Sequence, residues 1–167
     1  NHPNEPIRGK VKSPAIFTLA KQHDTALVTA MFPGKAKFRH LWLTGSLDRF
    51  DFNGPQEDKP LPGTEEIENA VVPAQTVARN ASEFIVTRKP NLCFIHFPDP
   101  DSAGHKSGWG SPEQKEAFKV SDQALGQIIR AIQQAGIASS SVILISADHG
   151  GHAKTHRENI PDDMNIP

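Results

Sequence analysis

The sequence has little of what would place it in several protein classes. A single cysteine, Cys93, excludes an intrachain disulfide and is expected to be a small core residue. The net charge is only −1, without a run of like charge, which argues against electrostatic binding of nucleic acid. The apolar runs 92–97 and 142–145 are far too short to cross a bilayer, and no signal peptide is visible. These absences favour a globular chain and leave its compartment open.

The length of 167 residues fits a single α/β domain, 1–167, that can bury a core. Only 37% of the residues are apolar, and 12 Gly and 14 Pro indicate many loops. The chain starts with Asn-His-Pro-Asn and stops with Asn-Ile-Pro, neither of which resembles a natural end. We therefore expect a piece of a longer protein.

Proline, glycine and hydroxyl residues divide the first half into elements. Ser13 followed by proline predicts a helix with Ser13 as its N-cap. Residues 25–32 predict a strand, and the polar stretch 48–63, interrupted by Gly and Pro, predicts a loop or small insertion. Thr64 is expected to cap a helix that runs, with a break at a proline, to about Arg88.

The second half predicts two strands separated by a long helix. Residues 92–97 (LCFIHF) are typical of a strand buried on both faces. Ser111-Pro112-Glu113-Gln114 is a capping box that begins an amphipathic helix ending at Gly136. Residues 141–146 (SVILIS) predict the next buried strand. This alternation predicts βαβ crossovers and a mainly parallel sheet.

Polar clusters follow both of these predicted strands. Residues 99–105 (DPDSAGH) come after the first strand and residues 148–152 (DHGGH) after the second. Because ligands bind beyond the carboxyl ends of parallel strands, both clusters should lie on the same rim of the sheet. Either cluster alone is as compatible with a helix cap or a turn as with a ligand. Two such clusters at equivalent positions favour metal binding.

The residue types of the clusters suit a divalent metal ion. Carboxylate oxygen and neutral imidazole together are typical ligands of Zn²⁺ or Mn²⁺. Asp101 and His105, four residues apart with a glycine between them, can fold back onto one ion. The adjacent Asp148 and His149 can also converge on a loop that leaves a strand.

PDSAGHKSGWG at 100–110 and SADHGGH at 146–152 resemble the paired metal motifs of the alkaline phosphatase superfamily. The closest likeness is to type I phosphodiesterases and nucleotide pyrophosphatases, especially bacterial members. It runs from SPAIFTLAKQHDTALVTAMFPGKAKF near the start to the final DMNIP. The pair of motifs is specific in this order, whereas either motif alone is weak. The resemblance implies an incomplete alkaline-phosphatase-like α/β fold with helices on both faces of a mainly parallel sheet.

The resemblance also implies the ligand sets of two metal ions, Zn²⁺ before Mn²⁺. Asp101 and His105 resemble ligands of one ion, and Asp148 and His149 resemble ligands of the other. Relatives add a third ligand to the first site from further along the chain. His156 resembles that ligand in the phosphomutase branch.

The third ligand has alternatives. We favour His156 over His152, because His152 lies only three residues after His149 and should face the wrong ion. In nucleotide pyrophosphatases the equivalent histidine comes much later, beyond the end of this chain. Asp99 is expected to be a loop residue, with a hydrogen-bond acceptor for one of the metal ligands as the alternative. His96 is expected to be a hydrogen-bonded core histidine.

Members of the superfamily also need an earlier Asp ligand and a Thr or Ser nucleophile, which we expect upstream of Asn1. Ser13 and Thr29 are better explained as an N-cap and a strand residue. Asn1 is a candidate for phosphate binding, with a plain loop residue as the favoured alternative. Trp109 is a candidate to stack on a base or aryl leaving group, with loop packing as the alternative. The chain by itself is expected to bind metal weakly and to be inactive.

The resemblance implies a metal-dependent hydrolase of phosphodiester, pyrophosphate or phosphomonoester bonds that acts through a Thr or Ser alkoxide. A phosphomutase, a sulfatase and a non-catalytic metal-binding module are the alternatives. A phosphomutase would need a larger cap insertion than residues 48–63. The expected partner is a small phosphoester, and the resemblance favours a periplasmic or secreted location.

Overall fold

The computed structural model describes residues 13–43, 45–52 and 70–165. Over these residues helices and short parallel strands alternate, as the sequence predicts. The elements are α1 (Ile16–His23), β1 (Thr29–Pro33), η1 (Ala36–Leu41), β2 (Arg49–Phe50), α3 (Ala74–Arg88), β3 (Leu92–His96), α4 (Asp99–Ser107), α5 (Pro112–Gln134), η2 (Ala138–Ser140) and α6 (Pro161–Met164).

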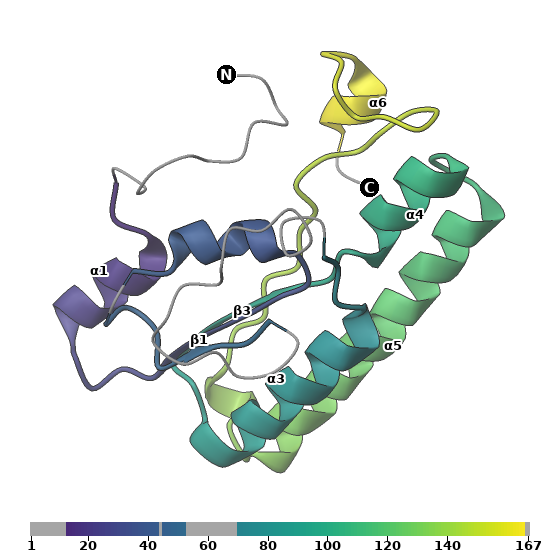
Figure 1. The fold of residues 1–167 in the computed structure, drawn as a ribbon. Coiled ribbons are helices and arrows are strands. Elements are labelled where there is room, and N and C mark those ends of the chain that lie inside the picture. Colours follow the sequence, from purple (N-terminus) through teal and green to yellow (C-terminus); the bar gives the residue numbers. More distant parts are fainter. Residues whose placement is uncertain (1–12, 44, 53–69, 166–167) are drawn as a thin grey trace.

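The described strands form a parallel sheet in the order β2-β1-β3. β1 and β3 pair in register from Thr29 opposite Leu92 to Pro33 opposite His96. Helices α3 and α5 lie on one side of the strands, and α1 and η1 lie on the other (Figure 1). The predicted α/β class, with helices on both sides of a parallel sheet, is confirmed.

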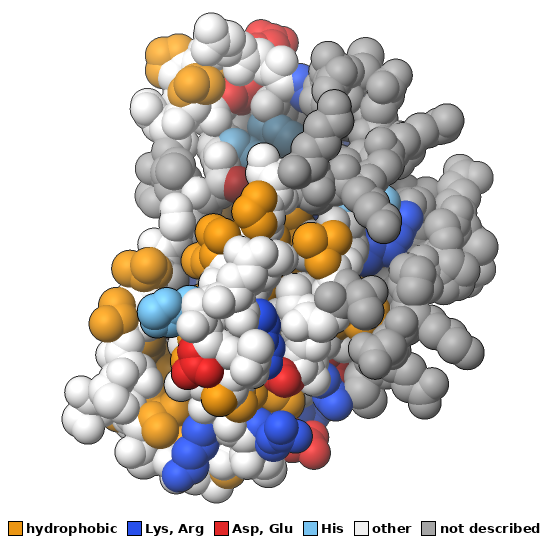
Figure 2. Space-filling model, turned by 90° about the vertical axis from the view of Figure 1, so that its left-hand side faces the viewer, with side chains coloured by type: hydrophobic (Ala, Val, Ile, Leu, Met, Phe, Trp, Pro, Cys, Tyr) orange, Lys and Arg blue, Asp and Glu red, His pale blue; other side chains and the backbone are white. Residues whose placement is uncertain are grey.

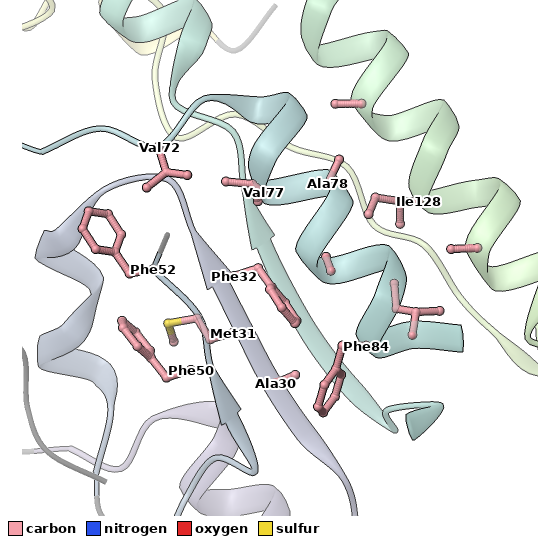
Figure 3. Close-up of a cluster of buried hydrophobic side chains, with 14 of the residues drawn as sticks. Ala30, Met31, Phe32, Phe50, Phe52, Val72, Val77, Ala78, Phe84 and Ile128 are labelled. Carbon is pink, nitrogen blue, oxygen red and sulfur yellow. The ribbon is translucent and has the colours of Figure 1, made fainter. Parts of the chain in front are cut away.

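The core forms where β1 passes beneath α3. Every residue of β1 is buried, because the strand is central and has helices over both faces. Phe32 of β1 meets Phe84 of α3 with ring centroids 5.7 Å apart. Ile128 brings α5 onto the outer side of the same cluster (Figure 3). The buried face of α3 follows a helical repeat: Val77, Ala78, Ala81, Phe84 and Ile85.

Helix α5 begins and ends where the sequence predicts. The hydroxyl of Ser111 accepts a hydrogen bond from the Gln114 amide at 3.2 Å, and Gly136 follows the last turn with φ +70°. The reciprocal half of the capping box is missing. The Gln114 side chain instead accepts from the Gly110 amide at 2.7 Å and donates to the Pro100 carbonyl at 3.1 Å. Gln114 therefore ties α5 to α4.

The first helix and strand begin later than predicted. The N-cap of α1 is Ala15, and no side chain caps it, so the prediction for Ser13 is wrong. β1 starts at Thr29 because the carboxylate of Asp24 accepts a hydrogen bond from the Ala26 amide at 2.8 Å. Such a local bond offers the backbone a turn in place of a sheet ladder.

The predicted loop 48–63 is wrong at its beginning. Arg49 and Phe50 form the edge strand β2, and Phe50 is 1% exposed. The remainder of that stretch and the predicted cap Thr64 lie outside the described residues. α3 begins at Ala74, directly after the proline where the sequence predicts a break.

The predicted strand at 141–146 is also wrong. Among the described residues this segment has no ladder partner, and Val142, Leu144 and Ile145 are 87%, 91% and 72% exposed. Because no described strand covers its other edge, β3 is only half-buried, with Phe94 37% exposed. A strand is stable only beside a neighbour that satisfies its backbone groups. The segment still runs from η2 back toward α4 and α6 (Figure 1).

The face that carries α1 shows hydrophobic side chains scattered among charged ones (Figure 2). Ile16 and Leu19 of α1 are 62% and 51% exposed, whereas Phe17 is buried. Scattered apolar residues of this kind are ordinary on protein surfaces. Within the described residues, the helices are all too short or too polar to cross a membrane.

Candidate metal centre

The candidate site lies at the carboxyl ends of β1 and β3. Helix α4 begins at Asp99, three residues after the last residue of β3. The cluster predicted as a loop is therefore helical. Asp101 and His105 stand one turn apart on the same face of α4, because residues four apart are neighbours on a helix. The helix, rather than a folded-back loop, brings them together.

Asp101, His105 and His156 form a triad. One ligand atom from each, a carboxylate oxygen and an imidazole nitrogen twice, lies within 4.8 Å of the others. From Oδ1 of Asp101 the distance to Nε2 of His105 is 3.3 Å, and to Nε2 of His156 it is 3.7 Å. This is the carboxylate and imidazole set that suits Zn²⁺ or Mn²⁺.

The hydrogen bonds around the triad leave Oδ1 of Asp101 and Nε2 of His105 available to a cation. Oδ1 of Asp101 is buried and has no hydrogen-bond partner among the described residues. A buried carboxylate oxygen left in this way is costly unless a cation satisfies it. Nδ1 of His105 lies 3.0 Å from the Lys154 carbonyl, which can only accept. Nδ1 therefore carries the proton, and Nε2 offers its lone pair toward Asp101. The residues fit a divalent ion.

Lys35 pairs with the other oxygen of Asp101. It follows β1, and its ammonium group donates a hydrogen bond to Oδ2. Burial alone would raise the pKa of Asp101, but the Lys35 ammonium outweighs it, so the pKa lies below its ordinary value. Asp101 is thus held ionised, with Oδ2 paired and Oδ1 directed at the histidines. Sequence reasoning missed Lys35, although its place after a strand end was a signal.

His149 lies beside this triad rather than apart from it. Its ring stacks on that of His156 with centroids 3.7 Å apart, and its Nε2 is 3.8 Å from Oδ1 of Asp101. Asp148, predicted to share an ion with His149, has a side chain 72% exposed and an oxygen 3.6 Å from the same Nε2. The structure brings His149 to the triad and leaves Asp148 at its margin.

His156 and His152 have different surroundings. Burial lowers the pKa of His156, and the neighbouring His149 lowers it further. A lowered pKa favours the neutral imidazole that binds metals. Nδ1 of His152 instead lies 2.7 Å from Oδ1 of Asp163, a residue that sequence reasoning missed and that no motif marks. Of the two candidates, only His156 reaches the triad.

Trp109 is packed against the site. Its ring lies 5.0 Å from that of His105 and 5.8 Å from that of His156, edge-on to both. A Cβ atom on Gly151 would approach the indole to 2.1 Å, so only glycine permits this contact. The indole therefore covers one side of the histidines. Stacking of Trp109 on a substrate stays a prediction.

The remaining predicted residues lie elsewhere. Asp99 is not a loop residue: it starts α4, and its carboxylate accepts a hydrogen bond from the Ala74 amide at 2.8 Å, which caps α3. His96 packs on Phe38 with centroids 4.6 Å apart. Burial lowers the pKa of His96 to about 4, and its Nδ1 has no hydrogen-bond partner in the described part of the chain. Asn1 lies outside the described residues.

Comparison with known proteins supports the resemblance. Residues 2–164 match the family described as type I phosphodiesterase / nucleotide pyrophosphatase. The chain belongs to this family. The match covers the polar clusters 99–105 and 148–152 and the segment that carries Lys35.

Individual relatives align over a shorter stretch. The chain is 36% identical over 62 residues to ectonucleotide pyrophosphatase/phosphodiesterase family member 3 of Rattus norvegicus, covering 37% of this chain and 7% of the relative. It is 35% identical over 60 residues to family member 7 of Mus musculus, covering 36% and 14%. Venom phosphodiesterase 2 of Crotalus adamanteus is 29% identical over 63 residues, covering 38% and 8%. The alignments therefore span a small part of each relative.

Proposed function

We propose that this chain supplies the metal centre of an enzyme that hydrolyses phosphodiester or pyrophosphate bonds in small phosphoesters. Asp101, His105 and His156 would hold one divalent ion, and Asp148 with His149 would contribute to a second. Zn²⁺ suits the donor set best, with Mn²⁺ next. The observation that carries the proposal is the triad: the buried Oδ1 of Asp101 faces two imidazoles and has no hydrogen-bond partner within the described part of the chain.

Each residue has a distinct task in this proposal. A bound divalent ion supplies charge stabilisation at phosphorus and an activated oxygen nucleophile at neutral pH. Lys35 keeps Asp101 ionised, and the Lys154 carbonyl fixes His105 in the tautomer that presents Nε2. Trp109 shields one side of the histidines from water, which strengthens electrostatic interactions there.

The nucleophile and the location belong to the same proposal. As the family resemblance implies, the proposal includes a Thr or Ser nucleophile upstream of Asn1, whose alkoxide would attack phosphorus. Two of the relatives are named ectonucleotide enzymes and a third a venom phosphodiesterase, which supports an exported protein.

Zn²⁺ titration calorimetry tests the metal centre. His156→Ala removes a proposed ligand, so the affinity for Zn²⁺ should fall. Loss of a residue that only hydrogen-bonds to a ligand typically lowers metal affinity by roughly 10- to 100-fold, and we expect a larger loss here. His23→Ala, at the exposed end of α1, is the matched control and should bind as the wild type does. Equal affinity of the wild type and His156→Ala would contradict the proposal. Zn²⁺-dependent hydrolysis of a synthetic phosphodiester by a longer protein that includes the proposed upstream nucleophile then tests the reaction class.

A further inference from the structure

The loop that carries His156 is closed by a second polar cluster, outside the triad. We call His152, Glu158 and Asp163 the clasp. Oδ1 of Asp163 lies 2.7 Å from Nδ1 of His152, and Oδ2 accepts a hydrogen bond from the Glu158 amide at 2.7 Å. A carboxylate oxygen of Glu158 is 3.6 Å from Nε2 of His152. The clasp thus joins both flanks of His156 to one carboxylate.

The carboxylate at the centre of the clasp is buried. Asp163 is 4% exposed, and both of its oxygens are used. Its backbone carbonyl also accepts a hydrogen bond from the Gly150 amide at 2.9 Å. A Cβ on Gly150 would come within 2.1 Å of the Asp162 carbonyl, so the two ends of the loop touch. Buried charge-assisted bonds of this kind hold geometry firmly.

Between the ends of the clasp, the loop is fastened to the triad. The backbones of His152 and Thr155 exchange two hydrogen bonds of 2.9 Å. The Ala153 carbonyl accepts from the Trp109 amide at 2.7 Å, and the Lys154 carbonyl faces Nδ1 of His105. Ala153 adopts φ +44°, a left-handed conformation that the surrounding bonds must maintain. The clasp therefore also presents the carbonyl that fixes the His105 tautomer.

We propose that Asp163 and His152 are positioning residues for the metal centre: the clasp closes the loop so that His156 reaches Asp101 and the Lys154 carbonyl reaches His105. This inference rests on the proposed function. His152 does not join the triad: its Nε2 faces Glu158, and its ligand atoms do not lie among those of Asp101, His105 and His156. Asp163 marks the far end of the loop, eleven residues from His152.

Four variants of the chain test the clasp by Zn²⁺ titration calorimetry. His152→Ala and Asp163→Asn should each lower the affinity about 10- to 100-fold, as loss of a group that orients ligands does. His152→Asn should restore most of it, because its side-chain amide can donate to Asp163 from the place of Nδ1. Asp162→Asn removes a neighbouring exposed carboxylate and should bind as the wild type does.

Amide hydrogen exchange without metal provides a second measurement. In His152→Ala and Asp163→Asn, the amides of Thr155 and Glu158 should exchange faster, while those of α3 and α5 stay protected. Protection of α3 and α5 also shows that a variant is folded. His152→Asn should resemble the wild type in this measurement as well.

The outcomes separate the clasp from the metal proposal. If His152→Asn loses as much affinity as His152→Ala, His152 is a ligand and the clasp inference is wrong. Wild-type affinity and exchange in His152→Ala and Asp163→Asn would also overturn it. If instead the wild type binds no Zn²⁺, the proposed function fails, and faster exchange of Thr155 and Glu158 in the clasp variants still decides whether the clasp holds the loop.

Discussion

Lys35 and Asp101 show how one residue sets the charge of another at the rim of the sheet. Burial raises the pKa of Asp101, and the Lys35 ammonium reverses this shift. In Lys35→Met, burial acts without that compensation, so the pKa of Asp101 should rise. Carbon-13 NMR titration of the Asp101 carboxyl group without metal measures the change. The neighbouring exposed Lys37 provides the control, since Lys37→Met should leave the pKa nearly unchanged. A pKa that stays low in Lys35→Met would contradict this role.

Gly151 is a residue whose small size lets Trp109 pack against the site. An added methyl group would lie 2.1 Å from the Trp109 ring, and the ring is confined by the histidines. Gly151→Ala should therefore lower the free energy of unfolding by about 1–3 kcal/mol. Gly126→Ala is the matched control: it lies inside α5, with only the end of the Arg130 side chain nearby, and should stabilise by about 0.5–1 kcal/mol. Urea unfolding measures both changes, and a neutral Gly151→Ala would show that Trp109 moves freely.

Among the elements, the loop 150–164 should respond to pH through its clasp. Asp163 raises the pKa of His152, chiefly through their hydrogen bond. Burial would raise the pKa of Asp163, but the bond to His152 prevails and lowers it. Because the pKa of His152 is raised, its protonated form stabilises the folded state fully below the unfolded pKa of about 6.5. That stabilisation is lost as the pH rises through the folded-state pKa. Because the pKa of Asp163 is lowered, its ionised form stabilises the folded state fully above the unfolded pKa of about 3.9. That stabilisation is lost as the pH falls through the folded-state pKa.

The contribution of the clasp should therefore be largest between about pH 4 and 6.5. Urea unfolding of the wild type and His152→Ala, repeated across this range, gives the difference in unfolding free energy. We expect that difference to shrink on both sides of the window. His23→Ala, which removes an exposed histidine, should show no such maximum. A difference that is independent of pH would show that the clasp carries no net charge interaction.

At the scale of the whole molecule, the exposed apolar segment 142–145 should contribute almost nothing to stability. Leu144 is 91% exposed, so Leu144→Ala should change the unfolding free energy by less than about 0.5 kcal/mol. The same truncation at Ile128, which is 4% exposed in the α3–α5 layer, should cost about 2–5 kcal/mol. Urea unfolding compares the two variants. A large cost for Leu144→Ala would show that this segment is packed as a strand after all.

The sequence by itself determined the elements whose signals are local. β3 and α5 lie where an apolar run and a proline-containing cap predict them, because such signals act within one turn or one strand. The parallel sheet followed from the alternation of elements. His149 of the second polar cluster lies beside Asp101 of the first, although the strand predicted before the second cluster does not form. The motifs also predicted that Asp101 and His105 act together, and the four-residue spacing serves that purpose on a helix as well as in a loop.

Only the tertiary structure decided what depends on distant partners. The apolar run 141–146 forms no strand with any other part of the described chain, since a strand needs a neighbour that its own residues cannot supply. Lys35 reaches Asp101 across 66 positions of sequence, and Asp163 reaches back to His152 without any motif that marks it. The different surroundings of His152 and His156 arise in the same way, and the assignment of the third ligand stays a prediction. Both histidines carry the same chemistry, and the hydrogen bonds that turn one toward Asp163 leave the other facing Asp101.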